Sequence, residues 1–462
     1  MKRILMAVFA VAVAAAWAVP SYAGEVTLSG EYRLRAEKRG DADFDENTKD
    51  STDMWGQRVR LTANAKATDD TSVKITLQDT RTWGATQAKA GGPGLTDGAA
   101  ATTTGTLNAL DLHESYVNIA NIAGQPVTVK LGRQELVYGD QRLIGAFGWS
   151  NNGRSFDALK LVYTHDAANV DLFTSKVRDS LVSGTDQDFN GLYATIKKLP
   201  VPNTTIDFYY LQLKDGQTAQ ANPFGIVGLG NTAVAGALIK PQKLNTYGVR
   251  LKGAVAGLDY TLELPFQSGT VETTTKTYKM SGSAFAGKAG YNIPGAPMKL
   301  RAGAEYDYAS GDKDGTDEKV KTFFNLFPTN HDKLGYMDLV AWRNIKAWNL
   351  NGSIEPMDNL KLLVSYWNFK LAAKEDGWYG AGNWNNAASG GIMAARAANA
   401  KVDIGSEIDI VVSHKLNSAV SCELGLSRFM IGAIAKDYFA TTATTEKETD
   451  QDWAYVSLTA TF

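Results

Sequence analysis

Apolar and polar residues alternate with a period of two along much of this chain. In residues 25–38 one set of alternate positions is apolar: Val26, Leu28, Tyr32 and Leu34. The positions between them are polar or charged: Thr27, Ser29, Glu31, Arg33 and Arg35. Because successive side chains of a β-strand point to opposite faces, this pattern predicts a strand with one apolar and one polar face.

About eighteen segments of roughly 9 to 16 residues show this pattern, and that length crosses a bilayer at a tilt. The first three cover residues 25–38, 58–67 and 71–83. The others begin near Ala109, Pro126, Arg154, Asn169, Gln187, Thr204, Leu244, Leu258, Thr275, Pro297, Val340, Asn359, Lys401, Ser418 and Asp452.

The connections between these segments alternate between long and short. The long ones are 39–53, 84–108, 135–153, 180–186, 215–243, 269–274, 311–339, 373–400 and 431–451. The short ones are 68–70, 123–125, 166–168, 200–203, 256–257, 292–296, 355–358 and 416–417. A soluble β-sandwich has no reason to alternate in this way, whereas a membrane barrel has short periplasmic turns and long outer loops. We therefore predict an all-β, transmembrane, antiparallel up-and-down β-barrel of about 18 strands, whose lumen admits water and solutes.

The two ends of the chain support this prediction. Residues 1–23 have a basic start, an apolar run and the small-residue pattern Ser21-Tyr22-Ala23, which indicate a cleaved secretory signal peptide. An uncleaved membrane anchor is the alternative. Residues 24–462 then form a single barrel domain in the Gram-negative outer membrane, in contact with lipid and lipopolysaccharide. The last strand ends on Phe462, and such a terminal aromatic predicts recognition by the barrel assembly machinery.

Composition excludes several functional classes. Without Lys2 and Arg3 the mature chain has 45 basic against 49 acidic residues, a balance that argues against nucleic acid as a partner. The single cysteine, Cys422, excludes an internal disulfide framework, and no Cys-x-x-Cys-His motif for c-type haem occurs. The four histidines lack zinc-ligand spacing, and no nucleophile elbow or phosphate loop is present. We predict no cofactor, no metal and no enzymatic activity, with a hydrolase whose Ser and His meet only in three dimensions as the remaining alternative.

Charged residues at the polar positions are the candidates for function. Lys or Arg on the lipid side costs about 2–4 kcal/mol at mid-bilayer, so their alternation with apolar residues directs them inward. Lys252, Asp259, Glu263, Asp307 and Asp409 belong to this inward set. The predicted pore-lining and substrate-contacting residues are Arg33, Arg35, Arg58, Arg60, Lys74, Lys130, Arg133, Arg142, Arg154, Asp157, Lys160, Arg250, Arg301, Glu305 and Glu407. Arginine-rich walls favour anions. The alternative is that the charges pair with one another and only solvate the lumen.

Two further features concern the predicted loops and strand ends. Residues 323–339 are too apolar for a freely solvated loop, so they fold into the barrel mouth or rest on its rim. Five tryptophans near strand ends predict an interfacial aromatic girdle, with sugar stacking as the alternative. They are Trp342, Trp348, Trp367, Trp378 and Trp453.

Three segments resemble the alginate export family of outer-membrane barrels. They are LGRQELVYGDQRLIG (131–145), NNGRSFDALKLVY (151–163) and FNLFPTNHDKLGYMDL (324–339). The resemblance implies an eighteen-stranded barrel with an arginine-lined, anion-favouring pore, and the family's namesake exports a polyuronate. The residues that match its signatures are Arg133, Glu135, Asp140, Arg142, Arg154, Asp157, Asn330, His331 and Asp338.

Three hypotheses follow for the function. The first is a passive outer-membrane channel for small anionic or sugar-like solutes, or for an acidic polysaccharide. The second is a barrel that sheathes a periplasmic partner such as a multihaem cytochrome or a secretion component. The third is a barrel enzyme acting on lipid or polysaccharide. A fold alone does not identify the cargo.

Overall fold

The computed structural model describes residues 24–41, 44–47, 51–83, 110–179, 186–216, 242–380, 401–436 and 448–462. The predicted signal peptide, residues 1–23, lies outside this described part. No helix within it is both long enough and apolar enough to cross a membrane.

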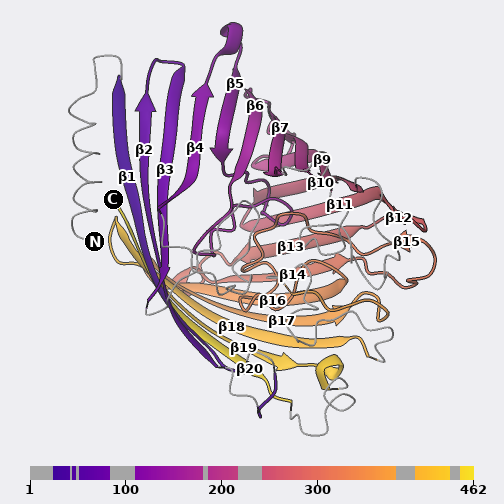
Figure 1. Cartoon of the computed structure of the whole chain (residues 1–462). Coiled ribbons are helices and arrows are strands. Elements are labelled where there is room, and N and C mark those ends of the chain that lie inside the picture. Colours follow the sequence, from indigo (N-terminus) through magenta and orange to yellow (C-terminus); the bar gives the residue numbers. More distant parts are fainter. Residues whose placement is uncertain are drawn as a thin grey trace.

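In the described part of the chain, eighteen long antiparallel strands form one closed sheet, as predicted (Figure 1). The first nine are β1 Glu25–Arg39, β2 Thr52–Lys66, β3 Thr71–Thr82, β4 Asp111–Ile119, β5 Val127–Gln134, β6 Phe156–Thr164, β7 Ala168–Arg178, β8 Gln187–Ile196 and β9 Thr204–Asp215. The others are β10 Gln242–Val255, β11 Leu258–Glu272, β13 Ala284–Asn292, β14 Arg301–Ala309, β16 Ile345–Met357, β17 Leu360–Leu371, β18 Asp403–Lys415, β19 Val420–Ile431 and β20 Gln451–Thr461. Long and short connections alternate between them, and we call the two rims the long-loop end and the short-turn end.

Short elements lie outside these strands. The strands β12 Thr277–Met280 and β15 Lys319–Val320 pair in parallel with each other, and β12 also pairs with β11. The turns η1 Ile122–Gly124 and η2 Pro297–Lys299 lie at the short-turn end.

Four predicted strand starts are wrong. β2 begins at Thr52 rather than at Arg58, and β14 begins at Arg301, after the turn η2 rather than within it. The strand expected from Thr275 is interrupted after β12 and resumes at Ala284. The strand expected from Val340 begins only at Ile345, because the buried Asn344 has a left-handed backbone (φ 44°) and donates through Nδ2 to Ala373 O (3.0 Å) and Gly377 O (2.9 Å). These bonds keep residues 340–344 in the preceding loop.

The barrel closes where the first strand meets the last. β1 pairs with β20 from Glu31 to Arg39, and the pairing continues past the strand end. Gly30 N donates to Phe462 O at 2.6 Å, and Phe462 N donates to Gly30 O at 3.1 Å. A Cβ on Gly30 would collide with the end of the Phe462 ring, so a larger residue here would require that exposed ring to turn away. Phe462 lies on the same outward face as Val456 and Leu458.

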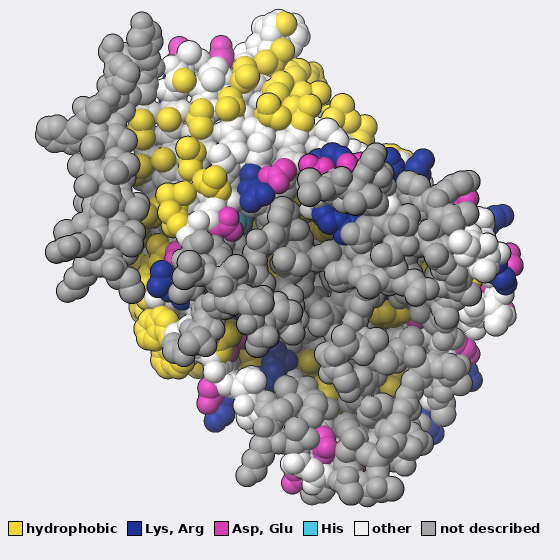
Figure 2. Space-filling model, viewed as in Figure 1, with side chains coloured by type: hydrophobic (Ala, Val, Ile, Leu, Met, Phe, Trp, Pro, Cys, Tyr) yellow, Lys and Arg dark blue, Asp and Glu magenta, His cyan; other side chains and the backbone are white. Residues whose placement is uncertain are grey.

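The outward face of the barrel is apolar and exposed. Figure 2 shows hydrophobic side chains gathered over the outer surface of the first strands. Leu28, Leu131, Leu350 and Leu426 are among the exposed large residues of this face. A surface of this kind needs lipid to cover it.

The girdle prediction is wrong for four of the five tryptophans. Only Trp348 is exposed, at 41%, whereas Trp342, Trp367, Trp378 and Trp453 are buried. On β17 and β20 the two strand tryptophans, Trp367 and Trp453, occupy positions whose side chains point inward, opposite to those of the exposed apolar residues. The exposed stacked pair Trp55 and Trp83, with centroids 5.8 Å apart, has the girdle role at the ends of β2 and β3.

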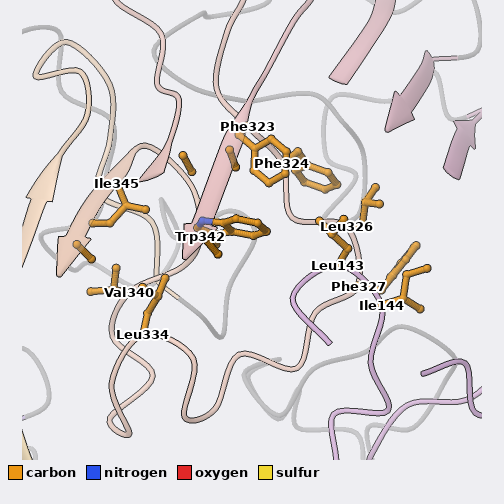
Figure 3. Packing of buried hydrophobic residues seen from close by; sticks show 14 of the residues in the cluster. Leu143, Ile144, Phe323, Phe324, Leu326, Phe327, Leu334, Val340, Trp342 and Ile345 are labelled. Atoms are coloured by element: carbon orange, nitrogen blue, oxygen red, sulfur yellow. The ribbon is translucent and has the colours of Figure 1, made fainter. Parts of the chain in front are cut away.

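The core lies inside the barrel rather than in its wall. Two connections, residues 135–155 (inner loop 1) and residues 310–344 (inner loop 2), fold inward from the long-loop end. They meet at a parallel bridge between Ile144 and Phe327. Around it Leu143 and Ile144 approach Leu326 and Phe327 (Figure 3). Of the two predicted positions for residues 323–339, folding into the barrel is therefore the one observed.

Candidate pore and its loop anchors

Inner loop 1 is attached to the barrel wall by arginines of β1 and β2. Arg33 donates to the carbonyl oxygens of Gly148 (2.8 Å), Trp149 (2.9 Å) and Ser150 (3.0 Å). Arg58, directly opposite Arg33 on β2, donates to Gly148 O (3.1 Å) and Ser150 O (3.0 Å). Arg58 also pairs with Glu31 (2.7 Å), so carbonyl oxygens and one carboxylate surround two adjacent guanidinium groups that would otherwise repel each other.

The same wall contributes further contacts. Arg35 donates to Trp149 O (2.6 Å), and its guanidinium carbon lies 3.8 Å from the centroid of the Trp149 ring. That ring also stacks on His331 of inner loop 2, with centroids 3.7 Å apart. Arg60 pairs with Glu135 Oε1 at 3.5 Å. Arg33, Arg35 and Arg58 are buried, so these arginines fix the loops in place.

Two of the predicted pore residues are among the groups that hold inner loop 2. Arg154, the last basic residue of inner loop 1, donates to Gly145 O (3.2 Å), Phe327 O (2.6 Å) and Pro328 O (2.8 Å). On the opposite side Glu407 of β18 accepts hydrogen bonds from Tyr336 N (2.6 Å) and Met337 N (2.9 Å). Two of the predicted pore residues, Arg154 and Glu407, therefore lie where they connect loop to loop and loop to wall.

Below the inner loops, toward the short-turn end, lies a cavity of about 740 Å³. β9, β10, β11, β13, β14, β16 and β17 form its wall and inner loop 2 contributes to its roof. Its charged lining residues are Asp140, Arg142, Lys252, Asp259, Lys288, Arg301, Glu305, Asp332 and Lys333. Neutral polar groups come from Asn349, Asn351 and Ser365.

Most charges around this cavity are paired. Arg301 forms a two-point contact with Asp259 (2.7 and 2.9 Å), and Arg142 contacts Asp307 at 3.0 Å and also Glu305. A second group of ion pairs joins Arg250 to Asp207 (3.0 Å) and to Asp140, while Lys288 also reaches Asp140 at 2.6 Å.

Lys252 differs from the other bases of the cavity. It is exposed to the cavity at an inward position of β10, and in the described part of the chain no carboxylate lies within ion-pair distance of it. It is therefore a cationic group that a solute can approach without displacing a partner.

The remaining predicted residues lie on β3, β5 and β6. Lys74 pairs with Glu114, and Lys160 pairs with Asp171 (3.3 Å). Arg133 and Asp157 pair with each other (2.8 Å) on the outward face, which they share with the exposed Leu131 and Leu159, so the pore-lining prediction is wrong for these two residues. Lys130 has no carboxylate partner among the described residues, and its ammonium lies 4.4 Å from the centroid of the Tyr116 ring. Lys130 and Lys160 are directly opposite each other. This wall is separate from the cavity and carries a second local excess of positive charge.

Asp140 and Arg154 are among the inner-loop residues whose pKa values are shifted. Burial raises the pKa of Asp140, but the neighbouring cations Lys288 and Arg250 lower it more, to well below its usual value. Burial lowers the pKa of the Arg154 guanidinium to about 10, so it stays charged at neutral pH. Both charges therefore persist under the conditions in which the barrel functions.

The prediction missed several cavity residues. Lys288, Asn349 and Asn351 were identifiable from their inward positions on β13 and β16, which alternate with exposed neighbours. Asp332 and Lys333 were not, because they lie in inner loop 2, whose path has no periodic signal. No group of three or more His, Cys, Asp or Glu residues able to hold a metal occurs among the described residues.

Comparison with known proteins gives the family and the fold. A family model described as "Alginate export" matches residues 25–446. No curated protein sequence matches. The structure is similar to Acinetobacter baumannii OccAB3 (TM-score 0.58, 9% identity, 95% of this chain and 99% of that chain) and to Pseudomonas aeruginosa OccD3 (0.58, 10%, 96% and 93%).

A further similar structure is Pseudomonas aeruginosa OccK11, with a TM-score of 0.54 at 11% identity over 95% of this chain and 96% of that chain. These likenesses establish the fold. With the apolar outer surface, the family confirms the predicted outer-membrane location and a channel that is not an enzyme. The chain belongs to the alginate export family of outer-membrane β-barrels.

Proposed function

We propose that this barrel is a passive channel for small anionic or sugar-like solutes, which cross its lumen through the cavity below the inner loops. The observation that carries the proposal is Lys252, a cavity-facing cation with no carboxylate partner in the described part of the chain. The proposal differs from the sequence-based prediction of an arginine-rich lumen in which residues attract the solute. Its arginines hold loops and ion pairs, and lysines provide the positive charge that attracts a solute.

The neutral part of the cavity wall supports the sugar-like half of the proposal. Asn351 is half-buried at the cavity wall and presents its amide group to a hydroxylated solute, whereas Asn349 and Ser365 are buried and already donate to Tyr366 O (3.0 Å) and Asp409 Oδ2 (3.0 Å). Paired charges such as Arg301 and Asp259 add hydrogen-bonding partners of both signs. Several weak contacts, rather than one strong one, let a solute enter and also leave.

The size of the cavity favours small solutes over a polymer. Pockets that bind small molecules have volumes of about 300–1,000 Å³, and this cavity of about 740 Å³ falls within that range. The inner loops pack against each other across the lumen through Ile144 and Phe327. An acidic polysaccharide or a sheathed periplasmic protein would have to displace that core, so both alternatives are disfavoured.

Reversal potentials in planar bilayers under a salt gradient test this proposal. We expect the wild-type channel to favour chloride over potassium and Lys252→Gln to reduce that preference by up to about fivefold, because a unit charge at about 4 Å in water is worth about 1 kcal/mol. Lys299→Gln is the control, because Lys299 lies in a turn and pairs with Glu355 at 2.5 Å. A cation-selective wild-type channel, or equal effects of the two variants, would contradict the proposal.

Recognition of Phe462 by the assembly machinery, and contacts with lipid and lipopolysaccharide, stay predictions. Pairing of Phe462 with Gly30 in the closed barrel supports the first only in part, because recognition would precede closure.

A further inference from the structure

Two pairs of lysines lie directly opposite each other on the outward face of the barrel. Lys346 of β16 is paired in register with Lys370 of β17, and Lys214 of β9 with Lys243 of β10. Their strand neighbours, such as Ala347, point inward and are buried, so the lysines point outward. Like charges at such positions destabilise a sheet, since the Cβ atoms are only about 4.5–5.5 Å apart.

No carboxylate neutralises these four lysines in the described part of the chain. Asp188, which lies opposite Lys214 on β8, pairs instead with Lys176 at 2.8 Å. Asp403, opposite Lys370 on β18, makes no ion pair with it. Considering only the described residues, each lysine pair is thus a double positive charge with no ion-pair partner.

Lys176 shows what a compensated position looks like. It is also an outward lysine near the long-loop end, on β7. Its ammonium lies 2.9 Å from Asp186 and 2.8 Å from Asp188. Some outward lysines of this rim therefore do have carboxylate partners, and the two lysine pairs differ from them.

The position of the pairs along the barrel indicates what they meet. Aromatic side chains lie one or two outward-facing rows away from each lysine pair, on the side of the short-turn end. They are Trp348 and Tyr366 for the pair on β16 and β17, and Tyr210 and Tyr247 for the pair on β9 and β10. Trp348, Tyr210 and Tyr247 are more than 40% exposed. Exposed Trp and Tyr rings mark the headgroup level of a membrane. The lysine ammonium groups extend beyond them, into the layer of lipid phosphates.

We propose that each lysine pair binds one phosphate group of an outer-leaflet glycolipid, lipopolysaccharide, whose acyl chains lie on the aromatic row below. Two ammonium groups at cross-strand spacing can donate to different oxygens of one phosphate. The bound phosphate then removes the repulsion within the pair. Both pairs lie at the long-loop end, which faces the cell exterior in such barrels, and this selects the glycolipid over an inner-leaflet phospholipid.

Lipid binding to the barrel folded from urea into detergent tests this inference. Native mass spectrometry would count tightly bound lipids for the wild type, the double variants Lys346→Gln/Lys370→Gln and Lys214→Gln/Lys243→Gln, and the control Lys176→Gln. Purified lipopolysaccharide, the same material after dephosphorylation, and phosphatidylglycerol serve as probes. Heat-dependent gel migration checks that each variant has folded.

We expect the wild type and Lys176→Gln to retain two lipopolysaccharide molecules and each double variant to retain one. The affinity lost at the altered site should be about tenfold or more, since each lysine near a lipid surface is worth about 1 kcal/mol. Unchanged stoichiometry in the double variants would overturn the inference. So would equal retention of the dephosphorylated glycolipid, or equal, lysine-dependent retention of phosphatidylglycerol.

Discussion

Two walls of this barrel carry basic residues at inward positions and use them differently. On the β1 and β2 wall, Arg33 and Arg58 are buried and donate to backbone carbonyls of inner loop 1. On the wall from β10 to β14, Arg301 is held by Asp259, and Lys252 is exposed to the cavity. The first wall fixes loops, and the second offers charge to a solute.

The difference shows that the inward direction of a side chain does not determine its role. A planar guanidinium with five donors can satisfy several loop carbonyls at once, whereas an ammonium is a compact charge on a flexible stem. Arginine therefore suits the anchoring wall. Lysine without a partner suits a passage in which a solute must bind weakly and leave.

The largest expected effect comes from the anchor between the two inner loops. Arg154→Gln removes the donor to three carbonyl oxygens, which are buried with it. We expect the free energy of unfolding to fall by about 3 kcal/mol or more, because each buried polar group left without a partner costs about 1–3 kcal/mol. Urea unfolding in detergent measures this. Arg154→Lys keeps the charge and should recover less than half of the loss, and a loss below about 1 kcal/mol in Arg154→Gln would contradict the anchoring role.

The anchoring wall itself should lose stability and keep its selectivity. Arg33→Gln removes donors to three carbonyls of inner loop 1, although Arg58 still reaches two of them, so we expect a loss of about 2 kcal/mol. Lys252→Gln should change the free energy of unfolding by less than about 0.5 kcal/mol. If Arg33→Gln instead shifts the reversal potential as Lys252→Gln does and leaves stability intact, the arginine wall lines the pore as the sequence predicts.

The pH dependence of Asp140 tests the ion-pair group beside the cavity. Because its pKa is lowered in the folded barrel, its charge stabilises the fold fully above its ordinary value of about 3.9, and the contribution is lost as pH falls further. The difference in unfolding free energy between the wild type and Asp140→Asn should therefore be constant from pH 8 to about 5 and shrink below about pH 4. A difference that already disappears near pH 6 would show that the lowered pKa is wrong.

The smallest expected effect concerns the second unpaired lysine. Lys130 lies 4.4 Å from the Tyr116 ring centroid, a contact that holds the ammonium against the wall. Lys130→Gln should therefore reduce anion preference less than Lys252→Gln, by less than about twofold. Equal shifts of the reversal potential in the two variants would show that the cavity is not the main selective region.

Much of the fold could be predicted from the sequence because the signal is local. Alternation along the strand ending at Leu458 and Phe462, and the regular change between short and long connections, require no knowledge of distant contacts. The paths of the inner loops do require it. Trp378 and Trp342 look like interfacial residues until Phe323 and Phe429 are known to pack around them.

The candidate site was predicted less well for the same reason. Periodicity directed Lys252 and Arg301 into the lumen, but the anchoring role of Arg33 depends on carbonyls more than a hundred residues away in the chain. No sequence motif predicts such a contact. The paths of the folded loops determine which cations bind protein groups and which are left to interact with a solute.

The contact between Gly30 and Phe462 continues a seam that joins the two most distant wall strands in the chain. β1 and β20 pair over residues 31–39 and 453–461, whereas the other long strands pair with their neighbours in the sequence. Forming this seam therefore loses more loop-closure entropy than any other pairing of the wall, and we expect it to be the last pairing made as the barrel folds.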